Sequence, residues 1–344
     1  MKIIDLFSGI GGFALGFQQA GYQFTEHYFS EIDKHAIANY KYNFPHAKYI
    51  GDITTLHGGD FTDIDIISFG SPCQDFSLAG KREGLKGAKS SLIQHAIALI
   101  AQLRPSVFVW ENVKGAFSSN AGADFWAIIQ ALANIGGYRL EWQLLNTSWV
   151  LPQNRERIYL VGHLGGKSIP GVFPIGENDK LLDRKAREKG WRGRNFKTSL
   201  ARTITARYSK MGSYDTYIVP KVAATLTGGG HSGGLHSDMT VIQINPSTES
   251  NGRQPYKQNR VFDVRGISPA LTRHNSNYAI SRMRRLTEIE CERLQGFPDN
   301  HTKYGNYDGI IKPIAKTQRY KLIGNAVTVD IVELIAKRLK NIQK

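Results

Sequence analysis

The sequence predicts an α/β protein, built on a parallel sheet with helices on both faces and interrupted by a basic, β-rich insert. Short β-rich runs alternate with helical stretches over the first 164 residues. From Gly165 the chain changes to short β-like pieces among glycine, serine, asparagine and basic residues, and helical periodicity returns near residue 284. With 344 residues, 41% of them hydrophobic, the chain can bury a substantial core.

The alternation assigns each element of the first part in turn. Strands are expected over residues 3–7, 27–30, 48–50, 64–69, 107–110, 140–145 and 157–164. Helices are expected over residues 12–20, 34–43, 91–103 and 124–135. Strand followed by helix, repeated in this way, is typical of parallel sheets, because parallel neighbours need a crossover connection.

We therefore divide the chain into residues 1–164, an insert of residues 165–283, and residues 284–344, which complete the first domain. Thr287 precedes two acidic residues, as an N-terminal helix cap should. The last segment, residues 323–344, reads as one amphipathic helix whose apolar face must dock on something large.

The positive charge of the chain lies in one part of it. Residues 1–163 carry 13 basic and 14 acidic side chains, whereas the remaining residues carry 31 basic and 15 acidic ones. Such asymmetry favours a polyanionic partner whose backbone is followed by lysine and arginine, so we expect the insert to bind nucleic acid.

The composition also bounds the cellular setting. Two cysteines can form neither a disulfide framework nor a zinc site by themselves, which favours a reducing compartment. The N-terminus lacks the pattern of a signal peptide, and no run of eighteen apolar residues occurs. We expect a cytoplasmic protein that binds neither a membrane nor a metal.

Reactive side chains of three kinds are expected on one rim of the sheet. Cys73 follows the strand of residues 64–69 behind a proline, where open α/β sheets place their ligand chemistry. Glu111 leaves the next parallel strand at the same edge, and Arg155 and Arg157 lie two residues apart at the start of a further strand. A thiol, a carboxyl group and a fixed cation would then converge.

A nucleoside ligand is expected at the neighbouring strand ends. The stretch "IIDLFSGIGGFALGF" reads as strand, glycine turn and helix, a weak signal by itself for a ligand at a helix N-terminus. Glu31 ends the second strand, where a carboxylate accepts hydrogen bonds from ribose hydroxyls. Asp52, after the third strand, is placed to accept from an adenine amino group.

Together these motifs resemble the DNA (cytosine-5-)-methyltransferase family, of the bacterial or phage type found in restriction-modification systems. The matching blocks, in order, are "DLFSGIGGFALGF", "EID", "GDIT", "GSPCQDFSLAGKREG", "ENVKG", "QNRERIYLVG", "RRLTEIECERLQGFP" and "IGNAV". They lie between Met1 and Val329 and exclude the basic insert. Eight ordered blocks are a far more specific signal than the glycine turn.

The resemblance implies a Rossmann-like fold that binds S-adenosylmethionine and releases S-adenosylhomocysteine, with the insert as a target recognition domain on double-stranded DNA. The catalytic residues it implies are Cys73, Glu111, Asn112, Arg155 and Arg157. The cofactor-binding residues are Phe7, Gly9, Gly11, Gly12, Glu31, Ile32, Asp52, Ile53, Pro72, Leu92, Asn325 and Val327. The DNA-binding residues are Gln74, Ser77, Lys81, Arg82, Lys89, Thr225 and Leu226.

The implied reaction is methylation of cytosine C5 after the Cys73 thiolate attacks C6. Glu111 would bind or protonate N3, Arg155 hold the carbonyl of the base, Arg157 support Glu111, and Asn112 contact the exocyclic amine. Relatives often have an aromatic residue where Ile32 stands, which leaves apolar packing against adenine. Relatives often have arginine at Lys89, and Cys291 has no family role, so we interpret Cys291 as packing.

The residues between Gln74 and Ser91 are expected to form a lid, because glycines and basic side chains dominate them. Three alternative functions are also considered from the sequence. A nicotinamide oxidoreductase explains the glycine turn but not the insert, and a DNA-binding protein without activity has no use for the catalytic set. A transfer RNA cytosine-5 methyltransferase would share the catalytic domain. We also expect a monomer, with a cognate restriction endonuclease that forms no stable complex with it.

Overall fold

The computed structural model describes residues 1–71, 92–117, 119–165, 171–176, 201–202, 217–218 and 284–342. The chain divides into two compact units, residues 1–214 with 287–344, and residues 215–286. In the second unit, the described strands β10 (Tyr217–Ile218) and β11 (Arg284–Arg285) pair in antiparallel fashion. The boundaries that we expect at residues 165 and 283 stay predictions.

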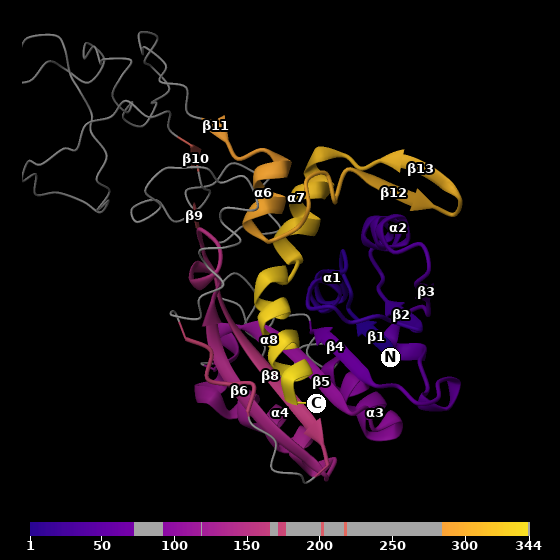
Figure 1. Ribbon diagram of the computed structural model, residues 1–344, viewed down its shortest axis with the longest axis vertical. Helices are drawn as coiled ribbons and strands as arrows, with labels where there is room; N and C mark the ends of the chain where they lie inside the picture. Colours follow the sequence, from indigo (N-terminus) through magenta and orange to yellow (C-terminus); the bar gives the residue numbers. More distant parts are fainter. Residues whose placement is uncertain are drawn as a thin grey trace, which may run out of the picture. The chain divides into compact units, whose positions relative to one another are not determined.

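The described part of the first unit is built on a seven-stranded sheet in the order β3-β2-β1-β4-β5-β8-β6 (Figure 1). Its strands are β1 (Lys2–Leu6), β2 (Glu26–Ser30), β3 (Lys48–Tyr49), β4 (Ile66–Gly70), β5 (Val107–Val113), β6 (Tyr138–Asn146) and β8 (Glu156–Leu164). The β3, β2, β1, β4 and β5 strands are parallel, as predicted.

The β8 strand departs from the predicted parallel arrangement, because it runs antiparallel to both β5 and β6. The connection from β6 to β8 spans only residues 147–155. A crossover to a parallel strand needs about a dozen residues or more, so this short connection returns the chain in the opposite direction. Within it, β7 (Gln153–Asn154) pairs with β9 (Ala201–Arg202).

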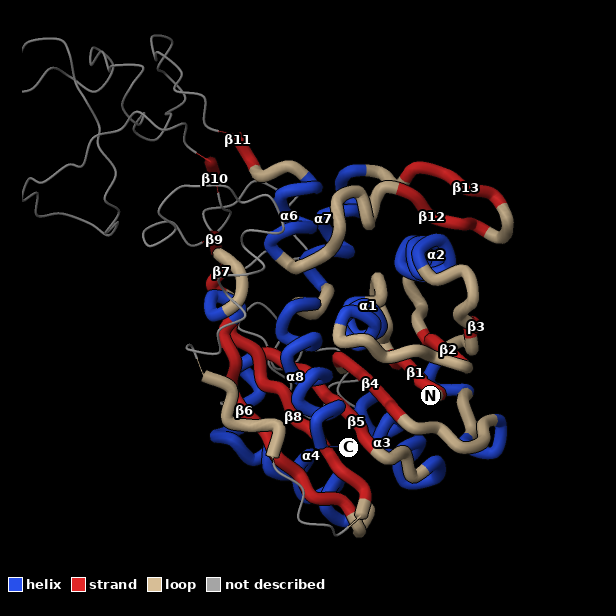
Figure 2. The backbone as a smooth tube through the Cα atoms, viewed as in Figure 1, coloured by secondary structure: helices blue, strands red, loops and turns tan. Residues whose placement is uncertain are grey.

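Helices cover both faces of the sheet, as the alternation predicts (Figure 2). The described helices of eight or more residues are α1 (Gly12–Gln19), α2 (Lys34–Asn43), α3 (Leu92–Leu103), α4 (Ala123–Asn134), α7 (Lys316–Asn325) and α8 (Val329–Ile342). The shorter ones are α6 (Glu288–Leu294), η1 (Ile53–Thr55), η2 (Gly58–Asp60), η4 (Lys114–Phe117), η5 (Ser119–Gly122) and η6 (Thr147–Trp149).

The sheet separates two apolar cores, one on each of its faces. Ile3 of β1 faces the side where α1 and α8 pack, and Ile4 faces the side where α3 and α4 pack. Successive side chains of a strand point to opposite faces, which is why consecutive isoleucines enter different cores. The predicted docking of the C-terminal segment on the first domain is therefore confirmed, since α8 packs against α1 (Figure 1).

The prediction of one helix over residues 323–344 was wrong. The α7 helix ends at Asn325, Ala326 has an extended backbone with φ −70° and ψ 153°, and α8 begins at Val329. Residues outside this segment stabilise the break between the two helices. Thr328 Oγ1 lies 2.7 Å from Thr147 Oγ1, and the N–H of Val329 donates to the carbonyl of Gln295. The hydrophobic pattern runs through this break and does not reveal it.

Beyond the sheet, α6, α7 and the hairpin of β12 (Tyr304–Tyr307) and β13 (Ile310–Pro313) form the C-terminal region, and α2 packs against β12. The predicted helix cap is confirmed, because Thr287 Oγ1 accepts from the N–H of Glu290 and the Glu290 carboxylate accepts from the N–H of Thr287. Cys291 is fully buried in α6, which confirms it as a packing residue.

A buried ion pair fastens this region together. The Glu292 carboxylate is fully buried, lies 2.9 Å from a terminal nitrogen of Arg319, and accepts the N–H groups of Asn300 and Thr302. We expect Arg319→Ala to lower the free energy of unfolding by about 3–5 kcal/mol, because it leaves the Glu292 charge buried without a cation. Chemical denaturation measures this change.

The matched control is Arg293→Ala. Arg293 pairs with Asp299 at 2.5 Å, but both side chains are more than 40% exposed. An exposed pair contributes at most about 1 kcal/mol, so this variant should unfold almost as the wild type does. Equal losses in the two variants would contradict the role given to burial.

Candidate active site

A glycine turn joins β1 to α1 and opens the candidate site. Phe7, Gly9 and Gly11 have φ of 50°, 54° and 83°, the left-handed region that favours glycine. A Cβ on Gly12 would lie 2.6 Å from Cγ2 of Val327, whereas a Cβ on Gly9 would meet no protein atom within 4 Å. Gly12 therefore allows the C-terminal segment to approach, and Gly9 keeps the turn accessible to a ligand.

Glu31 is bound to this turn from the end of β2. Its carboxylate accepts the N–H groups of Gly9 at 2.9 Å, Ile32 at 2.8 Å and Asp33 at 3.0 Å. The hydroxyl of Tyr49 donates to the Glu31 carbonyl. Glu31 is thus held in one orientation at the rim, with carboxylate lone pairs left over for hydroxyl groups of a ligand.

The next two rim positions combine an acid and apolar side chains. Asp52 caps η1, and its Oδ1 accepts the N–H of Thr54 at 3.0 Å. Ile53 is buried, whereas Ile32 is 70% exposed, an unusual position for a large apolar side chain. A carboxylate after β3 and an exposed apolar side chain after β2 are groups that suit a flat ring carrying an amino group.

The segment after α7 closes the other side of the turn. Asn325 is exposed, and Val327 is buried against the positions of Gly12 and Gly70. Leu92, also predicted to bind cofactor, begins α3 and is half-buried. The structure thus brings Gly12 and Val327 together, although more than 300 residues separate them.

Glu111 lies in β5 beside Gly70 of β4, and is 8% exposed. A Cβ on Gly70 would lie 3.3 Å from its Oε2, so Gly70 gives the carboxyl room. Burial raises the pKa of Glu111 above its ordinary range, although the charges of Arg157 and Arg155 oppose this rise. A buried carboxyl of this kind keeps its proton to higher pH than an exposed one does.

The two arginines occupy different places. Arg157 lies in β8, with its Nε 3.1 Å from Oε1 of Glu111. Arg155 precedes β8, is 3% exposed, and donates to the carbonyls of Gly324 at 3.4 Å and Ala326 at 2.8 Å. Arg155 therefore ties the loop before β8 to the segment after α7, while its charge still acts on Glu111.

Ser71 is a site residue that the sequence analysis missed. Its Oγ accepts hydrogen bonds from Trp110 Nε1 at 3.0 Å and from Asn112 Nδ2 at 3.1 Å. Asn112 is almost fully buried, and its Oδ1 accepts the N–H of Val113. These contacts fix the chain directly before Pro72. The signal that could have identified Ser71 is a polar residue between a buried strand and the Pro-Cys pair.

The remaining predicted residues lie outside the described part of the chain. They are Pro72, Cys73, Gln74, Ser77, Lys81, Arg82, Lys89, Thr225 and Leu226. Among the described residues, the glycine turn, Glu31 and Asp52 follow β1, β2 and β3, Glu111 lies in β5 beside the end of β4, both arginines lie at the start of β8, and Val327 packs against Gly12. No described helix is long and apolar enough to cross a membrane.

Comparisons with known sequences agree on one family. A sequence model of C-5 cytosine-specific DNA methylases matches residues 1–341. The chain is 30% identical to the type II methyltransferase M.Bsp6I of Bacillus sp. (strain RFL6), over 98% of each chain. It is 33% identical to the type II methyltransferase M1.ScrFI of Lactococcus lactis subsp. cremoris, over 98% of this chain and 77% of that protein.

Solved structures share the fold. The S. pombe Dnmt2 methyltransferase superposes with a TM-score of 0.61 at 19% identity, over 100% of both chains. The methyltransferase EhMeth of Entamoeba histolytica gives a TM-score of 0.64 at 14% identity, over 100% of this chain and 99% of that one. At these identities the similarity establishes the architecture of the sheet and its helices.

Proposed function

Since the chain belongs to the C-5 cytosine-specific DNA methylase family, and is a DNA (cytosine-5-)-methyltransferase, we propose that it methylates cytosine within a specific sequence of duplex DNA through a covalent bond to Cys73. The family reaction transfers a methyl group from S-adenosylmethionine to C5. The observation that carries the proposal is the pairing of the buried Glu111 with the partly buried Arg157, 3.1 Å apart, at the strand end next to the glycine turn.

The rim fits a nucleoside cofactor. Glu31 would accept the ribose hydroxyls, Asp52 the adenine amino group, and the exposed Ile32 would pack on the ring with Ile53 behind it. Phe7, Gly9, Gly11 and Gly12 would line the methionine part, with Pro72, Leu92, Asn325 and Val327 completing the pocket. When bound, S-adenosylmethionine supplies an electrophilic methyl group. The accessible backbone of Gly9 is the feature of the fold that supports this fit.

Cys73 supplies the nucleophile, two residues after Ser71 in the chain. Its thiolate forms a bond to C6 of cytosine, and the C5–C6 double bond gives its electron pair to C5 as N3 receives a proton from Glu111. C5 then takes the methyl group. A base removes the C5 proton, N3 returns its proton, and the bond between C6 and sulfur breaks, which releases 5-methylcytosine and the thiolate.

Glu111 and its neighbours handle the charge that develops on the ring. Burial keeps the Glu111 carboxyl easily protonated, and Arg157 fixes its orientation from β8. Asn112 would contact the exocyclic amine, and Arg155 would hold the base carbonyl while it fastens the segment after α7. Hydrogen bonds preset in a buried site stabilise the transition state more than bonds that must form during the reaction.

DNA binding would use the parts of the chain with excess positive charge. Lys81, Arg82 and Lys89 would bind phosphates, Gln74 and Ser77 would lie beside the target base, and residues near Thr225 and Leu226 would read the sequence. The cytosine must leave the helix to reach Cys73, which costs a few kcal/mol that phosphate contacts offset. The excess of basic side chains after residue 163 supports this division.

The relatives named above are type II methyltransferases. By analogy we propose a monomer of the cytoplasm that protects DNA from a restriction endonuclease of the same specificity, without a stable complex between them.

Methyl transfer to defined nucleic acids tests the proposed function. Labelled S-adenosylmethionine is incubated with the protein and either genomic duplex DNA or transfer RNA, and bisulfite sequencing then locates the modified carbon. We expect label in DNA only, at C5 of cytosines in one recurring sequence. Label in transfer RNA alone would reject the proposed substrate, and label in neither would reject the proposed enzyme.

Gly9→Ala tests the fit of the cofactor. A Cβ on Gly9 meets no protein atom, so the fold should lose only about 1 kcal/mol from the left-handed backbone. The bound cofactor would meet that Cβ, and its affinity should fall at least about tenfold, or about 1.4 kcal/mol. Equilibrium binding of S-adenosylmethionine and thermal unfolding measure the two effects.

Gly136→Ala is the matched control, because Gly136 also has a positive φ of 76° with no atom within 4 Å of a Cβ. It lies between α4 and β6, away from the turn. This variant should lose similar stability and bind the cofactor normally. Unchanged affinity in Gly9→Ala would show that the ligand lies elsewhere.

A further inference from the structure

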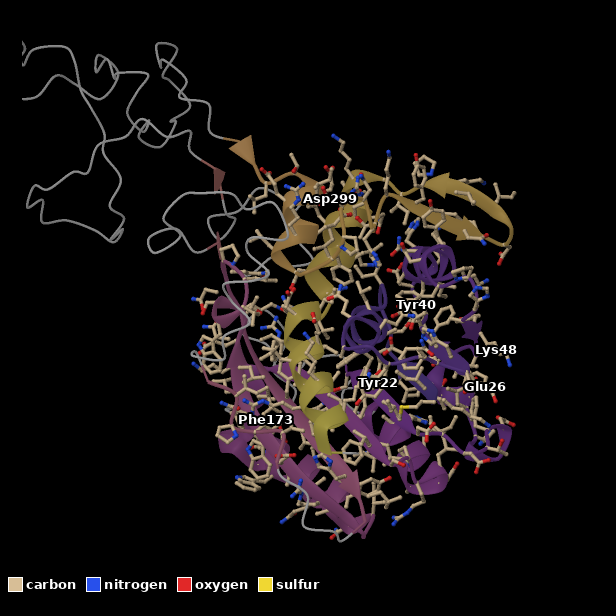
Figure 3. All side chains as sticks on the ribbon, viewed as in Figure 1. Tyr22, Glu26, Tyr40, Lys48, Phe173 and Asp299 are labelled. Atoms are coloured by element: carbon tan, nitrogen blue, oxygen red, sulfur yellow. The ribbon has the colours of Figure 1, made fainter. Side chains whose placement is uncertain are left out.

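A buried carboxyl lies directly behind the glycine turn. Asp5 of β1 is fully buried, and its carboxyl accepts the hydroxyls of Ser68 from β4 at 2.9 Å and Tyr40 from α2 at 3.0 Å. Figure 3 labels Tyr40 on its helix. The N–H of Ala14, in the first turn of α1, also stabilises the charged carboxylate. Asp5 thus contacts the helix that the turn leads into.

The groups that face Asp5 carry no positive charge among the described residues. They are the two hydroxyls, the Ala14 N–H, the carboxylate of Glu31 at the end of β2, and His27, whose Nε2 lies 2.7 Å from the Tyr40 hydroxyl. Burial lowers the pKa of His27 to about 4, so this ring is neutral. Within the described ranges of the chain, a charged Asp5 therefore faces no cation.

These surroundings make Asp5 exchange a proton near physiological pH. Burial raises its pKa to about 8, the Ser68 and Tyr40 hydroxyls lower it, and Glu31 raises it. The network accommodates both states. A protonated Asp5 can donate to Tyr40, which then donates to neutral His27, and a charged Asp5 accepts from Tyr40 instead.

We propose that Asp5 makes the site prefer S-adenosylmethionine to S-adenosylhomocysteine, by presenting a buried negative charge behind the turn to the sulfonium. This inference rests on the proposed function. S-adenosylmethionine carries a positive sulfonium and S-adenosylhomocysteine a neutral sulfur, while their other groups are the same. Glu31 binds the N–H of Gly9 and also interacts with Asp5, which links the carboxyl to the turn.

The sign of the pH effect follows from linkage. A positive ligand lowers the pKa of Asp5, so binding of S-adenosylmethionine releases protons near neutral pH, and its affinity rises with pH until Asp5 is charged in the free protein. The affinity for the neutral product, S-adenosylhomocysteine, should rise little over the same pH range. A shift of one pKa unit corresponds to a tenfold change, so the affinity ratio of the two ligands should be about tenfold larger at high pH than at low pH.

Calorimetric binding of the two ligands, between about pH 6 and about pH 9, tests the inference. In the wild type we expect the affinity ratio to rise about tenfold and proton release on binding of S-adenosylmethionine, seen as a dependence on the ionisation enthalpy of the buffer. Asp5→Asn should remove the rise of the affinity ratio and the proton release, except for any contribution from the amino group of the ligand. The amide resembles the protonated carboxyl in shape and hydrogen bonding.

Tyr40→Phe keeps the test decisive if Asp5→Asn does not fold. It removes a donor to the charged carboxylate, so the rise of the ratio should move to higher pH. Tyr22→Phe is the control, because Tyr22 is also buried and its hydroxyl donates to the Ala336 carbonyl. If Asp5→Asn or Tyr40→Phe showed the wild-type dependence of the affinity ratio on pH, this inference would be overturned and the proposed function would stand. If neither ligand bound the wild type, the proposed cofactor would be overturned as well.

Discussion

Cys73→Ala is expected to lower the rate of methyl transfer by about four orders of magnitude or more, because no other group supplies the bond to C6. Binding of DNA and of S-adenosylmethionine should survive, since neither depends on the thiol. Single-turnover methylation and equilibrium binding, measured on the same preparation, separate the two effects.

Cys291→Ala is the matched control for the nucleophile. Cys291 is fully buried in α6, and burial raises the pKa of its thiol far above the ordinary range, so the thiolate does not form. Loss of this thiol should leave methyl transfer at the wild-type rate. Normal turnover by Cys73→Ala would eliminate the covalent mechanism.

Glu111→Gln is expected to lower kcat by about two to four orders of magnitude, the usual contribution of a general acid. Glutamine fits the same space beside Gly70 and Arg157 but cannot give N3 a proton. Since burial raises the pKa of Glu111, wild-type activity should decline as pH rises through that pKa and the protonated form is lost. The variant should lack this decline, which the pH profile of kcat would reveal.

Glu156→Gln is the control on the neighbouring strand. Glu156 begins β8 and pairs with Lys114 at 3.0 Å, with both side chains at least 40% exposed. Its neutral variant should keep both the rate and the pH profile of the wild type. If Glu111→Gln also kept them, protonation of the base would have to come from another group.

The sequence was sufficient where a residue type answers a local requirement. The glycine turn, the Thr287 cap and the alternation of strands with helices from β1 to β5 all express short-range rules, and the structure follows them. The meeting of Glu111 and Arg157, by contrast, depends on the antiparallel direction of β8, which places its first residues beside the last residues of β5. The family resemblance added order and spacing over the chain.

Long-range contacts were not predictable in the same way. The sequence around Thr328 does not indicate that contacts with Thr147 and Gln295 separate α7 from α8 there. The contacts of Arg155 with the carbonyls of Gly324 and Ala326 likewise join segments about 170 residues apart. Asp5 reads as an ordinary residue at the end of a strand, and only the packing of Tyr40 and Ser68 around it reveals a buried, titratable carboxyl.

The covalent bond between Cys73 and cytosine is the central claim, and duplex DNA with 5-fluorocytosine at the target position tests it most directly. Fluorine at C5 cannot leave as a proton, so the bond between sulfur and C6 should persist after methyl transfer. We expect the wild type with S-adenosylmethionine to give a complex that survives denaturation, with the mass of protein, DNA and one methyl group, and Cys73→Ala to give none. A wild type that methylates ordinary DNA but never forms this complex would contradict the account.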